Sequence, residues 1–187
     1  ATHIRALGFE VLVTREPGGT EGAEAIRQLL LGGSADRWRP AAEALLFAAA
    51  RSDHVERLIR PALAQGKWVI SDRFIDSSRA YQGASSGIGD ADILKIHAVG
   101  SGGFLPDRTL ILDIDPATAL GRTQLRDGGE ADRIGGRQSA FHAAVRQAFL
   151  DLAAQEPDRI RVVDASNTAA EVTSAMLTQI EDLFAVA

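Results

Sequence analysis

Residues 68–83 read WVISDRFIDSSRAYQG, and this stretch indicates both the fold class and the chemistry. The short, β-branched apolar run 68–70 follows the helix breaker Gly66, which predicts a buried strand. In an open parallel sheet, ligands bind beyond the carboxyl ends of the strands. Asp72 and Arg73 fall at that end, where a carboxylate can hold a metal ion through its water shell and a guanidinium can bind a phosphate. The stretch therefore predicts phosphate chemistry.

The composition of the chain predicts one globular domain over residues 1–187, because 187 residues with 45% hydrophobic content can bury a core. The absence of cysteine excludes disulfides and thiolate metal sites. No run approaches the roughly 20 apolar residues of a membrane helix and no basic, apolar leader opens the chain. We therefore expect a soluble, cytoplasmic protein without a membrane partner. The net charge of −5 disfavours nucleic acid as a partner.

The cations of the chain are almost all arginine: of 20 basic residues, only Lys67 and Lys95 are lysines. A GC-rich coding bias would produce this pattern. Selection for planar, bidentate phosphate recognition would produce it too. Composition does not separate the two explanations.

Strand-like and helix-like segments alternate along the chain, which predicts a parallel sheet covered by helices on both faces. Two helical stripes with a spacing of four, at 141–149 and 172–184, are expected to lie in the core. A capping box formed by Thr168 and Glu171 should begin the second of these helices. The expected strands are 9–14, 68–71, 109–113 and 160–163, and the other expected helices are 20–31, 40–64 with a kink or restart at Pro61, and 90–99.

Residues 14–20, TREPGGT, follow the first expected strand. Pro-Gly-Gly is turn chemistry and needs no ligand. Alternatively, Arg15 and Glu16 stand at a strand's carboxyl end, where a charged pair can face a ligand.

Phe47 and Arg51 are four residues apart on the long expected helix and share one of its faces. A ring beside a guanidinium can stack on a nucleobase and hydrogen-bond its edge. Phe47 could equally be a core residue, because apolar residues surround it. Arg27 also stands on an expected helix, where a solvated arginine is the simpler interpretation.

Residues 121–137 carry arginines among glycines and acidic residues: Arg122, Arg126, Arg133 and Arg137. Such a run is usually a solvated surface loop. Alternatively it is a lid whose arginines reach transferring phosphates when it closes. The four histidines have no ligand spacing, so a zinc site is not expected.

Four segments in order give the chain a resemblance to bacterial-type thymidylate kinases: TREPGGT (14–20), LLFAAARSDHV (45–55), SDRFIDSSRAYQG (71–83) and ADRI (131–134). The resemblance covers almost the whole chain. It implies an α/β, P-loop nucleoside monophosphate kinase-like fold of three layers with parallel strand order 2-3-1-4-5. It also implies ATP-dependent, magnesium-dependent phosphorylation of dTMP to dTDP by a homodimer.

The resemblance further implies a role for individual residues. Glu16 would lie near the nucleoside monophosphate, and Asp72 would help to organise Mg²⁺ through water. Arg27 and Arg73 would bind the acceptor phosphate. The base would stack on Phe47, its edge would contact Arg51, Ser78 and Gln82, and Tyr81 would pack near the sugar. Arg126, with Arg122 and Arg133, would stabilise the transferring phosphoryl group from the lid.

The sequence departs from the family pattern at the donor site. No GxxxxGK[ST] phosphate loop occurs in residues 1–187; the only Gly-Lys pair, Gly66-Lys67, is followed by Trp68. We therefore expect that the first strand and the phosphate loop, about 20 residues, are missing from this chain. The expected sheet would then fall into two halves.

Two alternatives to thymidylate phosphorylation stay open from the sequence. One is a kinase for another nucleoside monophosphate or a deoxynucleoside, with a different base pocket around Arg51, Ser78 and Gln82. The other is a non-catalytic nucleotide-binding fragment, because the chain as it stands should be inactive without a phosphate loop.

Overall fold

The structure is a computed structural model that describes residues 1–34, 36–84, 86–115, 118 and 134–185. Its contacts group the chain into two compact units. The first comprises Ala1–Phe104 with Asp132–Arg137, and the second Leu105–Ala131 with Gln138–Ala187. The expectation of a single kinase domain stays a prediction.

The first unit contains a parallel pair of strands, β1 (Val11–Arg15) and β2 (Trp68–Asp72). Both lie within two residues of the expected strands. Arg15 stands opposite Asp72, so the two carboxyl ends meet at one edge of the sheet. The Glu16 backbone N–H continues the pairing by donating to the Asp72 carbonyl at 2.9 Å. This edge is where the sequence places the acceptor site.

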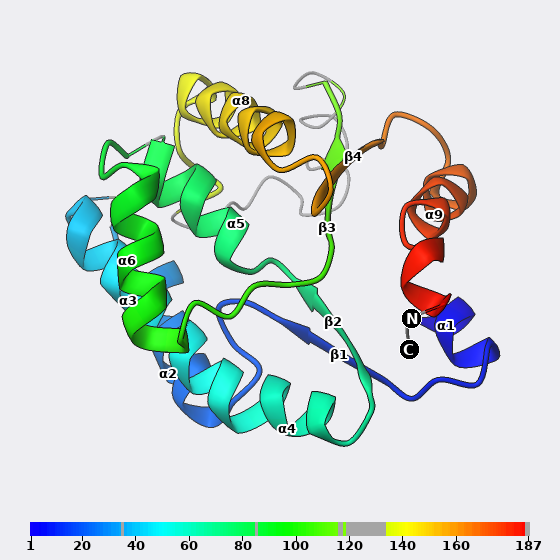
Figure 1. Cartoon of the computed structure of the whole chain (residues 1–187). Coiled ribbons are helices and arrows are strands. Elements are labelled where there is room, and N and C mark those ends of the chain that lie inside the picture. The colour runs from blue at the N-terminus through cyan, green and yellow to red at the C-terminus, as the bar shows by residue number, and fades with distance from the viewer. Residues whose placement is uncertain (35, 85, 116–117, 119–133, 186–187) are drawn as a thin grey trace. The chain divides into compact units, whose positions relative to one another are not determined.

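Helices of the first unit begin where the sequence supplies caps. The Thr20 hydroxyl accepts from the Ala23 N–H, and Pro40 occupies the first turn of the long helix. Helix α3 packs against both α2 and α6 (Figure 1). A core cluster of Ala44, Ile75 and Ile93 joins α3, α5 and α6. The helices are α1 (Thr2–Ala6), α2 (Glu21–Leu31), α3 (Pro40–His54), α4 (Arg60–Ala64), α5 (Ile75–Ser78) and α6 (Asp90–Ser101).

Two π-helical segments interrupt the helices of the first unit: η1 (Val55–Ile59) directly after α3 and η2 (Arg79–Ala84) directly after α5. In η1 the Arg60 N–H donates to the Val55 carbonyl, five residues back. The helix restarts as α4 with Pro61 in its first turn, as expected. The wider turn just before it is not visible in the sequence pattern.

The second unit contains the parallel strands β3 (Thr109–Asp113) and β4 (Ile160–Asp164). Helices α8 (Ser139–Gln155) and α9 (Ala169–Thr178) contact β4, and a 3₁₀ turn, η3 (Glu181–Ala185), follows α9. A core cluster of Leu152, Ala153 and Ile160 joins α8 to β4. The strand predicted at 109–113 is confirmed, and so is the capping box that begins α9.

The prediction that both helical stripes are core is only partly right. No residue of α9 is fully buried, and the second stripe, Val172, Met176, Ile180 and Phe184, is half-buried throughout. The helix ends at Thr178, and the chain continues as a 3₁₀ turn with about three residues per turn. In α8, Val145 is buried, whereas Phe141 and Phe149 are half-buried.

Among the described residues the strands form two separate two-stranded parallel sheets, β1–β2 and β3–β4. If the family's first strand is missing, β1 to β4 correspond to strands 2 to 5 of the expected order 2-3-1-4-5. The two sheets are then the expected pairs 2-3 and 4-5. The prediction of a missing central strand goes beyond these pairings and stays a prediction. No helix in the described part of the chain is long and apolar enough to cross a membrane.

Candidate active site in the first unit

A buried hydrogen-bonded group connects three of the predicted site residues. Arg51 on α3 donates from Nε to Glu16 Oε2 at 2.8 Å and from Nη2 to Ser78 Oγ at 2.6 Å. Glu16 follows β1 and Ser78 ends α5, so residues far apart in sequence meet through one guanidinium. All three side chains are buried. Among the described residues Nη1 of Arg51 has no hydrogen-bond partner, which leaves one donor for a ligand.

His54 extends this group, although no role was predicted for it. Its Nδ1 lies 3.1 Å from Glu16 Oε1, and its Nε2 lies 2.8 Å from Thr14 Oγ1. The ring is fully buried. A usable signal was present, because His54 follows Arg51 by three residues and so shares its helix face.

Gln82 is held by a second residue that sequence reasoning missed, Glu43. Gln82 Nε2 donates to Glu43 Oε1 at 3.0 Å, and Arg137 Nη2 donates to Glu43 Oε2 at 2.7 Å. Glu43 is 2% exposed, and Arg137 balances its charge. A glutamate inside the apolar stretch around Leu45 was the available signal.

Asp72 and Arg73 are exposed at the end of β2, as the sequence predicts. Neither side chain forms a hydrogen bond or ion pair within the described residues. The Arg73 guanidinium lies over the Tyr81 ring, 5.1 Å from its centroid. Arg73 has φ of 71°, a left-handed conformation that is costly for a residue with a long side chain. Such conformations cluster at functional sites.

The segment 14–20 combines the two interpretations that the sequence left open. It is a turn, in which the Gly19 N–H donates to Glu24 Oε1 at 3.0 Å. That bond is the main reason why the pKa of Glu24 lies below its ordinary value, with Arg15 assisting. The turn also carries Glu16 into the buried group. Arg27 donates from Nη1 to the Pro17 carbonyl at 2.8 Å and is half-buried.

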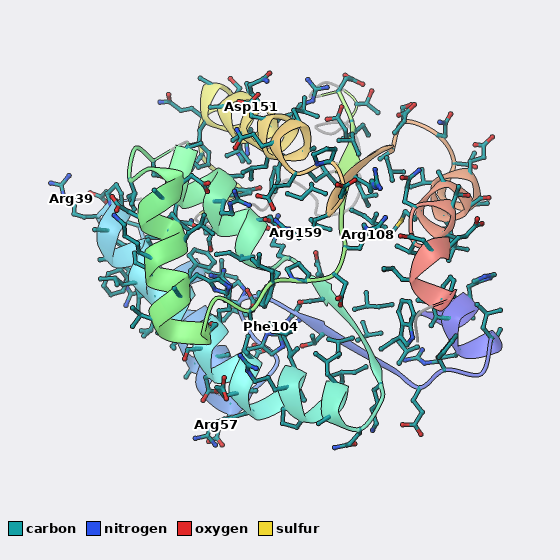
Figure 2. The ribbon with its side chains drawn as sticks, viewed as in Figure 1. Arg39, Arg57, Phe104, Arg108, Asp151 and Arg159 are labelled. Carbon is teal, nitrogen blue, oxygen red and sulfur yellow. The ribbon has the colours of Figure 1, made fainter. Side chains whose placement is uncertain are left out.

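Phe47 is half-buried on α3, and no aromatic ring in the described part of the chain stacks on it. It is therefore neither a fully buried core residue nor a freely solvated one. By contrast, Arg39 and Arg57 extend away from the helices into solvent in Figure 2. The predicted lid residues Arg122, Arg126 and Arg133 lie outside the described residues.

The side chains at the carboxyl ends of β1 and β2 could hold a magnesium ion only together with substrate phosphates and water. No group of three or more His, Cys, Asp or Glu side chains able to hold a metal occurs in the described ranges. Mg²⁺ in phosphoryl-transfer enzymes commonly uses one or two carboxylates together with substrate phosphates and water. The unpaired Asp72 carboxylate meets that requirement.

Comparison with known proteins identifies the family. The thymidylate kinase family model matches residues 1–176. The chain belongs to the thymidylate kinase family. It is similar to the thymidylate kinase of Rhizorhabdus wittichii, with 53% identity over 98% of this chain and 88% of that protein, and to the one of Caulobacter vibrioides, with 49% identity over 94% and 84%.

A solved structure agrees with this thymidylate kinase assignment. The crystal structure of thymidylate kinase from Ehrlichia chaffeensis matches with a TM-score of 0.70 and 32% identity, covering 97% of this chain and 84% of that one. The chain is thus an enzyme that phosphorylates dTMP to dTDP. The resemblance read from the four sequence segments is confirmed, whereas the predicted lack of a phosphate loop draws no support from these matches.

Proposed function

We propose that the acceptor dTMP binds beyond the carboxyl ends of β1 and β2, with its base against Phe47 and its edge facing Arg51. The observation that carries the proposal is the hydrogen bonding of the Arg51 guanidinium. Glu16 and Ser78 hold its guanidinium from two sides, and Nη1 keeps an unused donor. Nη1 is not one of the fully buried atoms that lack a partner in the described residues, so this donor stays accessible to a ligand or water that can satisfy it.

Base selectivity follows from the chemistry of these side chains. A guanidinium only donates, so it favours the O4 carbonyl of thymine over the 4-amino group of cytosine. Glu43 occupies the amide nitrogen of Gln82, and this leaves Oε1 of Gln82 as an acceptor for the N3–H of thymine. The Ser78 hydroxyl accepts a hydrogen bond from Arg51 and is the third group that would face the edge of the base.

The acceptor phosphate binds at Arg73, whose guanidinium is exposed and unpaired within the described residues, with Arg27 as the second cation. The Tyr81 ring under Arg73 orients that guanidinium and packs near the sugar, favouring a 2′-deoxyribose. Glu16 uses both carboxylate oxygens on protein groups. We therefore assign Glu16 to the positioning of Arg51 rather than to direct contact with the phosphate.

The donor in this proposal is ATP with Mg²⁺. Asp72 would hold the ion through water, and the ion would neutralise charge on the phosphates as they transfer. Arg126, with Arg122 and Arg133, would stabilise the transferring phosphoryl group from the lid. The family's phosphate loop is not in residues 1–187, so we propose that a segment outside this sequence supplies it.

A homodimer is proposed as well, in the cytoplasm. Leu45 on α3 and Val99 on α6 are apolar and 56% and 89% exposed. Exposed apolar residues on packed helices are typical of subunit interfaces when they gather.

A panel of acceptors tests the base assignment in the full-length enzyme without any risk to folding. We expect dTMP and dUMP to be phosphorylated well, and dCMP and dGMP at least 100-fold less efficiently in kcat/KM, because a site that hydrogen-bonds its ligand leaves groups unpaired with the wrong base. Replacing the guanidinium in Arg51→Lys should reduce the preference for dTMP over dCMP. A preference for dCMP or dGMP would contradict the placement of the base at Arg51.

A further inference from the structure

His54 is buried at the C-terminal end of α3, where it bridges Thr14 within β1 and Glu16 directly after this strand. Its ring reaches the Thr14 hydroxyl on one side and the Glu16 carboxylate on the other. Glu16 in turn holds Arg51, and Arg51 holds Ser78. Five side chains thus form one continuous hydrogen-bonded series from β1 through α3 to α5, entirely within the first unit.

We propose that His54 is a positioning residue for the acceptor base: it fixes the carboxylate of Glu16 and thereby the direction in which Arg51 presents its free Nη1. The inference rests on the proposed placement of the base at Arg51. His54 touches no substrate in this account and acts only through Glu16.

The chemistry of the ring explains why a histidine suits this position. An ionised carboxylate only accepts, so Nδ1 of His54 must carry the proton that it shares with Glu16. In the neutral ring Nε2 is then an acceptor, and the Thr14 hydroxyl donates to it. The two contacts fix the tautomer and the plane of the ring. One carboxylate oxygen of Glu16 is bound by His54 and the other by Arg51, so the carboxylate cannot pivot about either contact alone.

The turn after β1 is built closely around the contact between Thr14 and His54. A Cβ on Gly19 would lie 2.5 Å from Thr14 Oγ1 and 2.6 Å from His54 Nε2, closer than real side chains approach. Gly19 has φ of +90°, so a side chain there would be strained as well. The backbone of the turn therefore closes over this hydrogen bond, which a histidine that merely filled space would not require.

A second buried histidine of the same unit shows what a packing role looks like. His97 on α6 is 2% exposed, and its Nε2 lies 2.7 Å from the Phe104 carbonyl. Its Nδ1 has no hydrogen-bond partner. Burial lowers the pKa of His97, as expected for a ring kept neutral in the interior. His54 differs because both of its ring nitrogens have side-chain partners. One of these partners, Glu16, holds the predicted substrate-binding residue Arg51.

The test compares variants of the full-length enzyme by steady-state kinetics with dTMP, dCMP and ATP. His54→Leu removes both contacts and should raise the KM for dTMP at least tenfold and reduce the ratio of kcat/KM between dTMP and dCMP, while the KM for ATP stays within twofold. His54→Asn keeps an N–H directed toward Glu16 and should recover most of this loss. Thr14→Val removes only the partner of Nε2 and should give a smaller change in the same direction.

Val55→Ala is the matched control, because Val55 is fully buried, adjacent to His54 and apolar. It should lower the thermal midpoint without changing the ratio of dTMP to dCMP efficiency. If His54→Leu and Thr14→Val behave like Val55→Ala, the positioning role is overturned. If Arg51→Lys also leaves the ratio unchanged, the placement of the base at Arg51 fails first, and the role of His54 fails with it.

Discussion

Arg73 has a left-handed backbone, and its guanidinium forms no ion pair within the described residues. The sequence predicts its chemistry, because a charged residue at the carboxyl end of a parallel strand faces the ligand edge. The sequence does not predict its φ of 71°, since arginine has no preference for that region. The conformation comes from the turn between β2 and α5, where the Ser71 hydroxyl donates to the Arg73 carbonyl at 2.8 Å.

Two substitutions separate the backbone of Arg73 from its side chain. Arg73→Ala keeps the left-handed conformation, whereas Arg73→Gly relieves it, so we expect the glycine variant to be more stable by about 1 kcal/mol. Both variants lose the guanidinium and should bind dTMP about 10- to 100-fold more weakly. Urea unfolding and calorimetric titration with dTMP measure the two effects.

Arg57→Ala serves as the control for charge, because Arg57 is exposed and, within the described residues, pairs with Asp53 one turn earlier and with no other acid. It should leave dTMP affinity unchanged. Equal stability of Arg73→Ala and Arg73→Gly would show that the left-handed conformation carries no cost.

Among the elements, the junction of α5, η2 and α6 depends on one buried arginine. Arg79 is 4% exposed and donates to both carboxylate oxygens of Asp90, at 2.7 and 2.9 Å, and to Asp76 at 3.2 Å. Asp90 begins α6, so this ion pair ties the segment that carries Tyr81 and Gln82 to the start of the next helix. Sequence patterns predict where a helix such as α6 begins. They do not predict an ion pair between residues on different elements.

Asp90→Asn should destabilise the protein because it leaves Arg79 buried with less compensation. Breaking a buried pair costs about 3–5 kcal/mol, and the partial exposure of Asp90 reduces the expected loss to about 1–3 kcal/mol. Asp92→Asn, two residues along the same helix, alters an exposed pair with Lys95 and should change stability by less than about 0.5 kcal/mol. Matching urea midpoints for the two variants would rule out a structural role for the Arg79–Asp90 pair.

The bounds of the helices and strands show which structural features sequence patterns can predict. The strand at 109–113 and the capping box at Thr168 are predicted correctly, because β-branched runs and capping residues act locally. The second helical stripe is half-buried and not core, because a spacing of four shows which residues share a face but not how completely other elements cover that face. The buried Glu43 and His54 escape prediction for a related reason, since their partners lie on other elements.

At the scale of the whole molecule, the predicted acceptor residues all belong to one of the two compact units. Glu16, Arg51, Arg73 and Gln82 lie in Ala1–Phe104. The family resemblance predicts the pairing of neighbouring strands, and alternation of elements alone predicts only a parallel sheet. The expectation that the sheet falls into two halves agrees with the two separate two-stranded sheets, one in each unit, whereas the boundaries of the units along the chain were not predicted, because they depend on contacts between elements distant in the sequence.

Hydrogen exchange should reveal this division when dTMP is added without ATP. A ligand at 100 times its Kd stabilises the bound state by about 2.7 kcal/mol, equivalent to about 100-fold slower exchange through openings that release it. We expect slowed amides in β1, β2 and α3 and unchanged amides in β3, β4 and α8. Uniform protection of both units would place acceptor contacts outside the first unit.

The two π-helical segments have a consequence for the history of the sequence. Each of them holds a residue more than an α-helix of equal rise would need, one just after Arg51 and His54 and the other bearing Tyr81 and Gln82. Deleting a single residue from Val55–Ile59 would restore an ordinary helix of the same rise and leave the elements after it in place, whereas the same deletion inside α3 would turn everything after it by about 100°. A gap of one position in an alignment is therefore tolerable at this π-helical turn and not within the helix before it.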